Sequence, residues 1–269
     1  MQFTKMQGLG NDYIYVNLWE EEITQPEKLA VRWSDRHFGI GADGLILIGK
    51  SEIADVRMEM YNADGSSGAM CGNGIRCVAK YAYEQGLVRK KKIKIETLSG
   101  VKETILLPNG EVCVNMGTPI VEAIHQKVIL ITDKGYEGNV DYISMGNPHA
   151  VVYPEEFGWD EDPEHLELES WGPLFERHLG EKRVNTEFLR VLDRKTMELR
   201  VWERGSGETL ACGTGACAAA VSSILRNLTD REVRIKLKGG NLLVKWGEDG
   251  ESLYMTGPAV TVFKGDITV

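Results

Sequence analysis

Two cysteines begin matching glycine-bearing motifs. Residues 71–74 read Cys-Gly-Asn-Gly, and residues 212–215 read Cys-Gly-Thr-Gly, about 140 residues later. Apolar residues at helical spacing follow each motif, so Cys71 and Cys212 are each expected at the start of a helix. The unpaired N–H groups and partial positive charge of a helix N-terminus stabilise a thiolate and lower a cysteine pKa. The pattern therefore predicts two reactive thiols.

Helix starts of this kind also suit a carboxylate ligand, because glycines without a Cβ let backbone amides approach it closely. A carboxylate held by both starts would have one thiol on each side of its α-carbon. One thiolate would remove the α-proton while the opposite thiol delivers a proton, and the amides would stabilise the enolate-like charge. The predicted chemistry is a two-base inversion of a stereocentre by Cys71 and Cys212 across one active site.

The other cysteine chemistries are less well supported. Five cysteines in a chain of 269 residues make a poor disulfide framework, so free thiols are expected. A disulfide between Cys71 and Cys212 is physically possible, but it would be an oxidised resting state. No Cys-x-x-Cys spacing occurs, so no metal site is expected. The remaining three are expected to pack in the core: Cys77, Cys113 and Cys217.

The composition is that of an ordinary globular protein, with 42% apolar and 26% charged residues. A net charge of −9 argues against a broad nucleic-acid footprint. No apolar stretch reaches the roughly 18 residues of a membrane span, and the N-terminus lacks a signal-peptide pattern. The expectation is a cytoplasmic protein with no nucleic-acid or membrane partner.

Six short segments recur in the same order in both parts of the chain, which indicates two homologous halves. Residues 42–48 resemble residues 185–191, and the alternating segment 56–61 resembles 197–202. We expect an α+β fold with pseudo-symmetric halves over residues 1–117 and 118–259. Each half is expected to be a curved, mainly antiparallel sheet wrapped around one central helix. Further strands are expected at 45–48, 93–97, 111–116, 128–132, 234–237 and 242–246.

Motifs along nearly the whole chain resemble those of the diaminopimelate epimerase family. The matching segments of the first half are 8–12 (Gly-Leu-Gly-Asn-Asp), 61–66 (Tyr-Asn-Ala-Asp-Gly-Ser) and 70–74 (Met-Cys-Gly-Asn-Gly). Those of the second half are 145–149 (Met-Gly-Asn-Pro-His), 184–188 (Val-Asn-Thr-Glu-Phe), 202–205 (Trp-Glu-Arg-Gly) and 211–215 (Ala-Cys-Gly-Thr-Gly). The resemblance implies conversion of LL- to meso-diaminopimelate without pyridoxal phosphate or any other cofactor, on the route to lysine and a cell-wall precursor.

The resemblance also implies roles for individual residues. Cys71 and Cys212 would be the acid/base pair, and Glu203 and His149 would lie beside the thiols and set their protonation. The amides that would hold the reacting carboxylate are those of Gly72, Asn73, Gly213 and Thr214. The residues that would grip the substrate, chiefly at its distal end, are Asn11, Asn62, Asn147, Asn185 and Arg204.

The family pattern carries two further implications and one departure. Members usually form homodimers, and their last strand returns to the first half, which here would join residues 260–269 to residues 1–117. Some members carry a substrate-binding glutamine after Gly-Ala-Asp, but this chain has Gly44 there. That position is therefore left out of the expected site.

Three alternative functions stay open at this point. Residues 39–44 fit a Gly-x-Gly-x-x-Gly dinucleotide motif, although a strand rather than a helix is expected after it. The same scaffold could act on proline derivatives, histidine or another amino acid. It could also be a non-catalytic ligand-binding protein.

Overall fold

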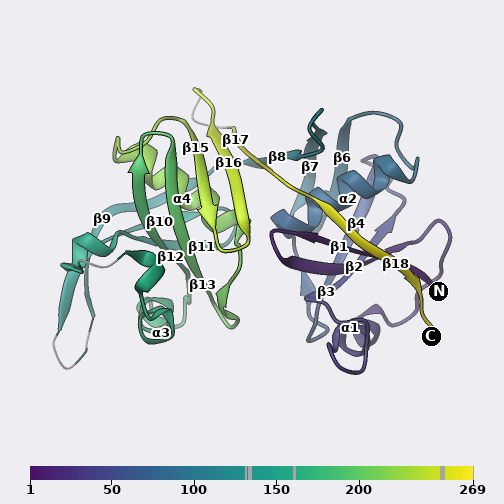
Figure 1. Ribbon diagram of the computed structural model, residues 1–269, viewed down its shortest axis with the longest axis horizontal. Helices are drawn as coiled ribbons and strands as arrows, with labels where there is room; N and C mark the ends of the chain where they lie inside the picture. Colours follow the sequence, from purple (N-terminus) through teal and green to yellow (C-terminus); the bar gives the residue numbers. More distant parts are fainter. Residues whose placement is uncertain (131, 133–134, 160–161, 249–251, 269) are drawn as a thin grey trace. The chain divides into compact units, whose positions relative to one another are not determined.

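The computed structural model describes residues 1–130, 132, 135–159, 162–248 and 252–268, and it divides the chain into two compact units (Figure 1). Unit 1 comprises Met1–Asn115 and Thr256–Val269, and unit 2 comprises Met116–Met255. The end of the chain returns to unit 1, where β18 (Val260–Asp266) pairs antiparallel with β1 (Gln2–Gly8). Ile131 and Val269, which belong to two of the expected strands, lie outside the described residues.

Unit 1 is a mainly antiparallel sheet. Antiparallel pairs join β1 to β2, β3 to β4, β4 to β5, β6 to β7 and β7 to β8, whereas β2–β3 and β4–β6 are parallel. The strands are β2 (Asn11–Asn17), β3 (Gly44–Gly49), β4 (Val56–Asn62), β5 (Ser67–Gly68), β6 (Lys92–Thr97), β7 (Gly100–Leu106) and β8 (Val112–Gly117). The helices are α1 (Pro26–Ser34) and α2 (Gly72–Glu84).

Unit 2 repeats this pattern of pairing. Antiparallel pairs join β9 to β10, β10 to β11, β12 to β13, β13 to β14 and β15 to β16, whereas β11–β12 and β13–β15 are parallel. The strands are β9 (Ile120–Leu130), β10 (Tyr136–Ser144), β11 (Pro148–Val152), β12 (Asn185–Asp193), β13 (Thr196–Glu203), β14 (Gly207–Thr209), β15 (Glu232–Leu237), β16 (Gly240–Trp246) and β17 (Leu253–Gly257). The helices are η1 (Pro154–Phe157), η2 (Pro163–His165), α3 (Leu168–Arg177) and α4 (Gly213–Leu225).

One helix forms the centre of each unit. In unit 1, α2 packs against β1, β2, β4, β6 and β7; in unit 2, α4 packs against β10–β13, β15 and β16 (Figure 1). Helix α4 contains no charged residue, and nearly all of its side chains are buried, because the sheet surrounds it. The α+β class and the sheet wrapped around a central helix are thus confirmed. The dinucleotide motif is not followed by a helix, since β3 begins at Gly44.

Strand registers correct one detail of the internal repeat. Ile46 lies opposite Met60, and Glu187 lies opposite Val201; Met60 and Val201 precede the two cysteines by the same number of residues. Ile46 and Glu187 are therefore equivalent positions. The expected alignment of residues 42–48 with 185–191 is wrong by two residues, which a period-two strand tolerates because the same face stays inward. In the corrected alignment Gly44 is equivalent to Asn185.

Two helices were not expected from the sequence. Helix α1 has Pro26 in its first turn and buries Leu29 and Trp33. Helix α3 contains Pro173 and Gly172, which disfavour a helix, yet it forms because it buries Phe175 and packs closely on unit 2. A Cβ at Gly172 would collide with the indole of Trp202, so packing against Trp202 requires glycine at this position of the helix.

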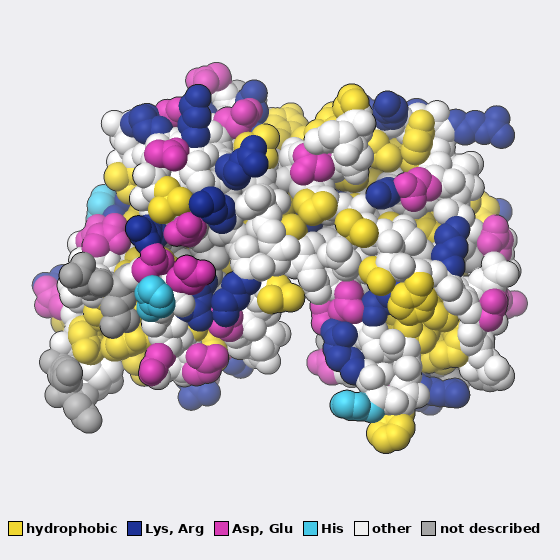
Figure 2. Space-filling view, viewed as in Figure 1, with side chains coloured by type: hydrophobic (Ala, Val, Ile, Leu, Met, Phe, Trp, Pro, Cys, Tyr) yellow, Lys and Arg dark blue, Asp and Glu magenta, His cyan; other side chains and the backbone are white. Residues whose placement is uncertain are grey.

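On the face of the molecule drawn in Figure 2, basic and acidic side chains are interspersed across the surface of each unit. No helix in the described part of the chain is long and apolar enough to cross a membrane.

Candidate active site

Cys71 and Cys212 both occupy the N-cap of a central helix. The Cys71 sulfur accepts a hydrogen bond from the Gly74 N–H at 3.2 Å, and the Cys212 sulfur accepts one from Gly215 at 3.4 Å. Both cysteines have extended backbone torsions, as is usual at an N-cap. The helix starts expected from the two glycine-bearing motifs are confirmed.

The glycines at Gly74 and Gly215 allow the helix start to pack on the sheet. A Cβ at Gly74 would lie 2.8 Å from the Ile46 side chain, and one at Gly215 would collide with the Glu187 carboxylate. These two glycines therefore face inward rather than toward a ligand, unlike the sequence-based expectation. Donors for a ligand must therefore be the backbone N–H groups of earlier residues in the first turn, which make no hydrogen bond within the helix.

In unit 1 the Cys71 thiol is held by an asparagine. Cys71 Sγ donates to Asn11 Oδ1 at 3.1 Å, and Asn11 Nδ2 in turn donates to Asp43 Oδ2 at 2.7 Å. Asp43 also accepts from the Asp12 N–H at 3.0 Å, which fixes the start of β2. The Tyr13 hydroxyl interacts with both Asn11 and Cys71, and burial, Cys71 and Asp43 keep its pKa far above the usual value. Tyr13 is therefore a neutral phenol beside the thiol.

An ion-pair network holds the carboxylates next to Asn11. Lys5 forms an ion pair with Asp12 at 2.6 Å, and the exposed Arg36 bridges Asp12 and Asp43 at 2.9 and 3.0 Å. The hydrogen bond and charge of Arg36, together with Lys5, outweigh burial and lower the pKa of Asp12. The network keeps Asp12 ionised and holds the Asp43 carboxylate in place as an acceptor for Asn11.

The first turn of α2 contains a fully buried arginine. Arg76 donates to the Gly72 carbonyl at 3.0 Å, to Asn73 Oδ1 at 2.9 Å and to the Pro258 carbonyl at 3.0 Å. These bonds hold the Gly72 backbone and the Asn73 side chain, at the predicted carboxylate-binding positions. Asn62 lies at the end of β4, where its amide donates to Ser66 at 2.9 Å.

In unit 2 the Cys212 thiol lies between a hydroxyl and a carboxylate. Thr214 Oγ1 lies 3.4 Å from the sulfur and accepts from Asn147 Nδ2 at 3.4 Å, which links three predicted site residues. Glu203 hydrogen-bonds to Cys212, and its Oε1 accepts from Thr209 Oγ1 at 2.6 Å. The structure thus brings Asn147, Thr214 and Glu203 together around Cys212.

The expected lowering of the thiol pKa is wrong for Cys212. Burial, followed by the negative charges of Glu203 and Glu187, raises the pKa of Cys212 well above its usual value. The Thr214 hydroxyl and the Gly215 N–H act in the opposite direction but are outweighed. Burial also raises the pKa of Glu203, helped by Glu187. Cys212 is therefore a thiol in the unliganded protein, because the helix start does not offset two nearby carboxylates.

His149 has a carboxylate partner that the sequence reading left unassigned. His149 Nδ1 lies 2.7 Å from Glu187 Oε1, and both side chains are fully buried. Burial raises the pKa of Glu187, and the imidazole opposes this shift. Glu187 lies within the 184–188 motif, and a glutamate flanked by buried strand residues is the signal that marks it.

The loop at Glu203 and Arg204 is positioned by residues from two other elements. Asn185 Oδ1 accepts from the Arg204 N–H at 3.0 Å, so this predicted ligand contact orients the loop backbone. Glu176 on α3 accepts from Trp202 Nε1 at 2.7 Å and from the Gly205 N–H at 3.3 Å, and it pairs with Arg183. Arg204 itself is exposed. Nothing in the local sequence predicts the role of Glu176, because its partners are far along the chain.

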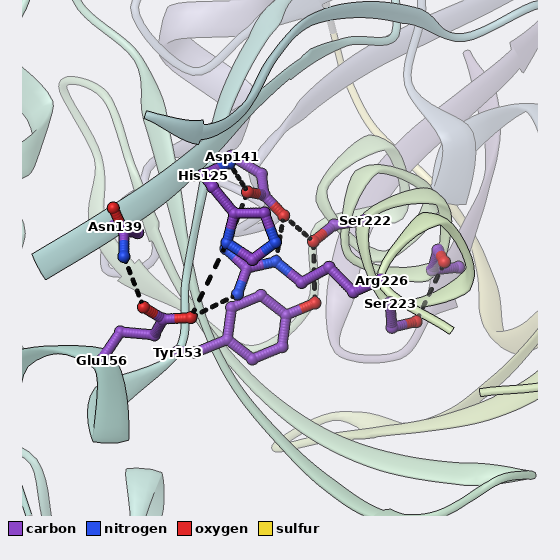
Figure 3. A network of polar contacts seen from close by, with 9 residues as sticks. His125, Asn139, Asp141, Tyr153, Glu156, Ser222, Ser223 and Arg226 are labelled. Atoms are coloured by element: carbon purple, nitrogen blue, oxygen red, sulfur yellow. Dashed lines mark hydrogen bonds and ion pairs between the residues drawn. The ribbon is translucent and has the colours of Figure 1, made fainter. Parts of the chain in front are cut away.

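A buried ion-pair network anchors the C-terminal end of α4 (Figure 3). Arg226, the C-cap residue, binds both carboxylate oxygens of Asp141 at 2.7 Å and Glu156 at 2.6 Å. Its guanidinium lies 4.1 Å from the centre of the Tyr153 ring, and Ser222 donates to Asp141 at 2.6 Å. A helix held at this end presents Cys212 at a fixed place at the other end.

The other three cysteines differ in how far they are buried. Cys77 and Cys217 are buried as expected, whereas Cys113 is partly exposed because it lies on the outer side of β8. None of the five cysteines forms a disulfide in the described part of the chain. Within the described ranges, no group of three or more His, Cys, Asp or Glu side chains has a metal-binding arrangement.

Comparisons with known proteins identify the family of the chain. The diaminopimelate epimerase family model matches residues 3–122 and 141–262. Proteins named diaminopimelate epimerase from Acetivibrio thermocellus and Methanococcus maripaludis are 49% and 47% identical to the chain. The first alignment covers 99% of this chain and 98% of the relative, and the second covers 100% of both.

Solved structures share the fold at much lower identity. A hydroxyproline epimerase from Agrobacterium vitis superposes with a TM-score of 0.75 at 16% identity, over 99% of this chain and 90% of the other. A PhzF-family phenazine biosynthesis protein from Bacillus anthracis gives 0.72 at 17% identity, over 100% and 99%. These two show a common fold, and the family model with the full-length relatives decides the assignment. The chain belongs to the diaminopimelate epimerase family.

Proposed function

We propose that the protein inverts the α-carbon of LL-diaminopimelate to give meso-diaminopimelate, using Cys71 and Cys212 as its acid and base and no cofactor. The curated relatives that match the full chain carry the name of this activity. The reaction serves the synthesis of lysine and of a cell-wall precursor.

The observation that carries the proposal is the N-cap position of both cysteines. Each unit presents a sulfur atom beside first-turn amides, Gly213 and Thr214 in one unit and Gly72 and Asn73 in the other. Such amides stabilise a carboxylate and, more strongly, the enolate-like charge of a carbanion intermediate. A sulfur next to a carboxylate cradle is placed to exchange the proton on the adjacent carbon.

The two thiols divide the work of one inversion. One thiolate takes the α-proton, so that the C–H bond breaks and an S–H bond forms, and the other thiol gives its proton to the opposite face. Because Cys212 is protonated in the unliganded protein, its sulfur can deliver a proton. Glu203 and His149 help to set the protonation of the thiols, and Asn11 orients Cys71.

The distal end of the substrate is a second amino-acid head, which needs acceptors for its ammonium and donors for its carboxylate. Asparagine side chains supply both, and an arginine offers two parallel donors to a carboxylate. The residues assigned to this head are Asn11, Asn62, Asn147, Asn185 and Arg204. The exposed guanidinium of Arg204 supports its assignment to the substrate.

The test is turnover of LL-diaminopimelate in deuterated water. The proposal expects meso product with deuterium at one α-carbon, and a loss of about 100-fold in kcat/KM for Arg204→Ala, chiefly through KM. Arg194→Ala, which removes an exposed arginine paired with Asp230, is the control. Absence of α-deuterium under any condition would instead indicate a ligand-binding protein.

A different amino acid is the second candidate substrate, since a hydroxyproline epimerase has the same fold. The exchange experiment should therefore also be run with hydroxyproline, proline and histidine as substrates. One of these amino acids could exchange its α-hydrogen faster than diaminopimelate, at a rate that Arg204→Ala does not change. That result would show that the natural substrate lacks a distal charged head.

Two expectations about the protein in the cell stay predictions. A homodimer predicts about twice the mass of the 30.0 kDa chain in light scattering. A cytoplasmic location predicts that fractionated cells retain the protein in the soluble cytoplasmic fraction.

A further inference from the structure

Glu187 is a buried carboxylate that the scaffold does not need. Its equivalent in unit 1 is Ile46, which fills the same place beneath the helix start, beside Gly74 rather than Gly215. An apolar residue therefore suffices for packing in this fold. A buried carboxylate carries a large desolvation cost, as other buried ions do. Its retention beneath Cys212 points to a role other than packing.

The single hydrogen bond of Glu187 is directed at His149. Glu187 Oε1 lies 2.7 Å from His149 Nδ1, whereas Glu187 Oε2 and His149 Nε2 are buried without a hydrogen-bond partner among the described residues. The imidazole is therefore held through one nitrogen by one carboxylate. In unit 1 the strand position corresponding to His149 is Tyr13, which faces an asparagine and the thiol and needs no such partner.

The groups around this pair lie in unit 2, near the start of α4. Glu187 on β12 contacts His149 on β11; Glu203 on β13 interacts with both of them and with Cys212 at the start of α4. The hydroxyl of Thr214 completes the set. Two carboxylates, one imidazole and one thiol thus lie close enough to interact, and the position of one proton depends on the others.

We propose that Glu187 is a positioning residue for the inversion: it keeps a proton on His149 Nδ1, which fixes the orientation of the ring and leaves Nε2 as the nitrogen available to the reacting groups. This inference rests on the proposed function. A carboxylate that accepts from one imidazole nitrogen raises the basicity of the other, as in catalytic and metal-binding Glu/Asp–His pairs. Glu187 acts through His149 and does not touch the substrate.

The direct test is the protonation of His149 in the free protein, measured by long-range ¹H–¹⁵N correlation spectra assigned with His149→Gln. The proposal expects Nδ1 to be protonated at neutral pH. A neutral ring protonated only at Nε2 would overturn it. This measurement needs no substrate, so its result stands even if the protein does not act on diaminopimelate. The wild-type spectrum also decides the proposal should a Glu187 variant fail to fold.

The second test is Glu187→Gln, which keeps the shape but can donate from its amide to Nδ1. We expect a loss of about 10- to 100-fold in kcat with KM changed less than about twofold, a shifted pH profile, and a lower population of protonated Nδ1. Glu198→Gln, a half-exposed carboxylate of β13 paired with Lys236, is the matched control and should change none of these. Unchanged kcat and unchanged His149 protonation in Glu187→Gln would overturn the proposal.

Discussion

The two halves of this chain have the same backbone around their cysteines and opposite charges beneath them. In unit 1 the helix that follows Cys71 has a fully buried arginine, Arg76, in its first turn, and the thiol bonds to a neutral asparagine. In unit 2 the position of Arg76 is taken by Cys217, and the Cys212 thiol faces Glu203 with Glu187 nearby. The internal repeat therefore preserves the place of the sulfur but not its electrostatic surroundings.

The C-terminal ends of the two central helices also differ in charge. The C-cap of α2 is Gln85, whose side chain accepts an exposed hydrogen bond from Lys264 at 3.2 Å. The C-cap of α4 is Arg226, bound to the fully buried Asp141 (Figure 3). The difference shows that the two copies of a duplicated fold can hold an N-cap sulfur in place through quite different interactions at the other end of the helix.

The largest expected effect is the loss of either sulfur. Cys71→Ala and Cys212→Ala should each lower kcat by about 1,000-fold or more, because an inversion needs both an acid and a base. Steady-state kinetics with LL-diaminopimelate measure this. Cys113→Ala is the control, since that residue lies outside both helix starts. A Cys71 variant that kept most of its activity would show that the halves are not equal partners.

Next in size is the anchor of α4. Asp141→Asn should destabilise unit 2 by about 3–5 kcal/mol, because Arg226 loses the charge that compensates its burial. Urea unfolding followed by the fluorescence of the tryptophans of unit 2 measures it. Gln85→Ala, at the corresponding end of α2, should cost less than about 1 kcal/mol. Equal losses would contradict the contrast between the helix ends.

Asp141 also predicts a pH dependence. Its pKa lies below the ordinary value of 3.8, and although burial opposes this, Arg226 and Ser222 stabilise the ionised form. The pair therefore contributes stability above the unfolded-state pKa, and this contribution is lost as the pH falls through the lower folded-state pKa. Asp141→Asn should lack this part of the acid dependence.

A tenfold effect is expected from one carboxylate beside Cys212. Glu203→Gln removes a negative charge, so the pKa of Cys212 should fall and its alkylation by iodoacetamide should become about ten times faster near neutral pH. Peptide mass spectrometry follows each cysteine separately, with Cys71 as the internal control. If Cys212 reacted no faster, the carboxylate would not be what keeps it protonated.

The smallest effect is expected from Arg36, the exposed residue of the ion-pair network with Asp12 and Asp43 in unit 1. Arg36→Ala should cost at most about 1 kcal/mol of stability and reduce kcat only a few-fold, because exposed ion pairs are weak. Thermal unfolding and initial rates measure the two quantities, and Arg57→Ala provides a comparison at another exposed pair. A large loss would mean that Asp43 depends on Arg36 to orient Asn11.

Local signals in the sequence predicted the helix starts at Cys71 and Cys212, since a cysteine, two glycines and helical spacing lie within a few residues. Alternation likewise predicted β4 and β13. The misaligned repeat at residues 42–48 shows the limit of such signals, because a slip of two residues leaves a strand pattern unchanged.

What the sequence did not predict depends on contacts between distant segments. Glu187 raises the pKa of Cys212 although it is 25 positions away in the chain, and Glu176 holds the Trp202 loop from a helix containing proline and glycine. Arg76 is buried because it donates to the Pro258 carbonyl, 182 positions away in the chain. Residue type alone therefore predicted a reactive Cys212, and only the tertiary structure shows that it is held as a thiol.

The central claim is that the two sulfurs serve opposite faces of one carbon, and exchange of the α-hydrogen in single-cysteine variants tests it most directly. LL- and meso-diaminopimelate are incubated separately in deuterated water with Cys71→Ser or Cys212→Ser, and α-deuterium is measured. We predict that each variant exchanges a different stereoisomer, the one whose α-hydrogen faces the remaining cysteine. Exchange of the same stereoisomer by both variants would contradict the account.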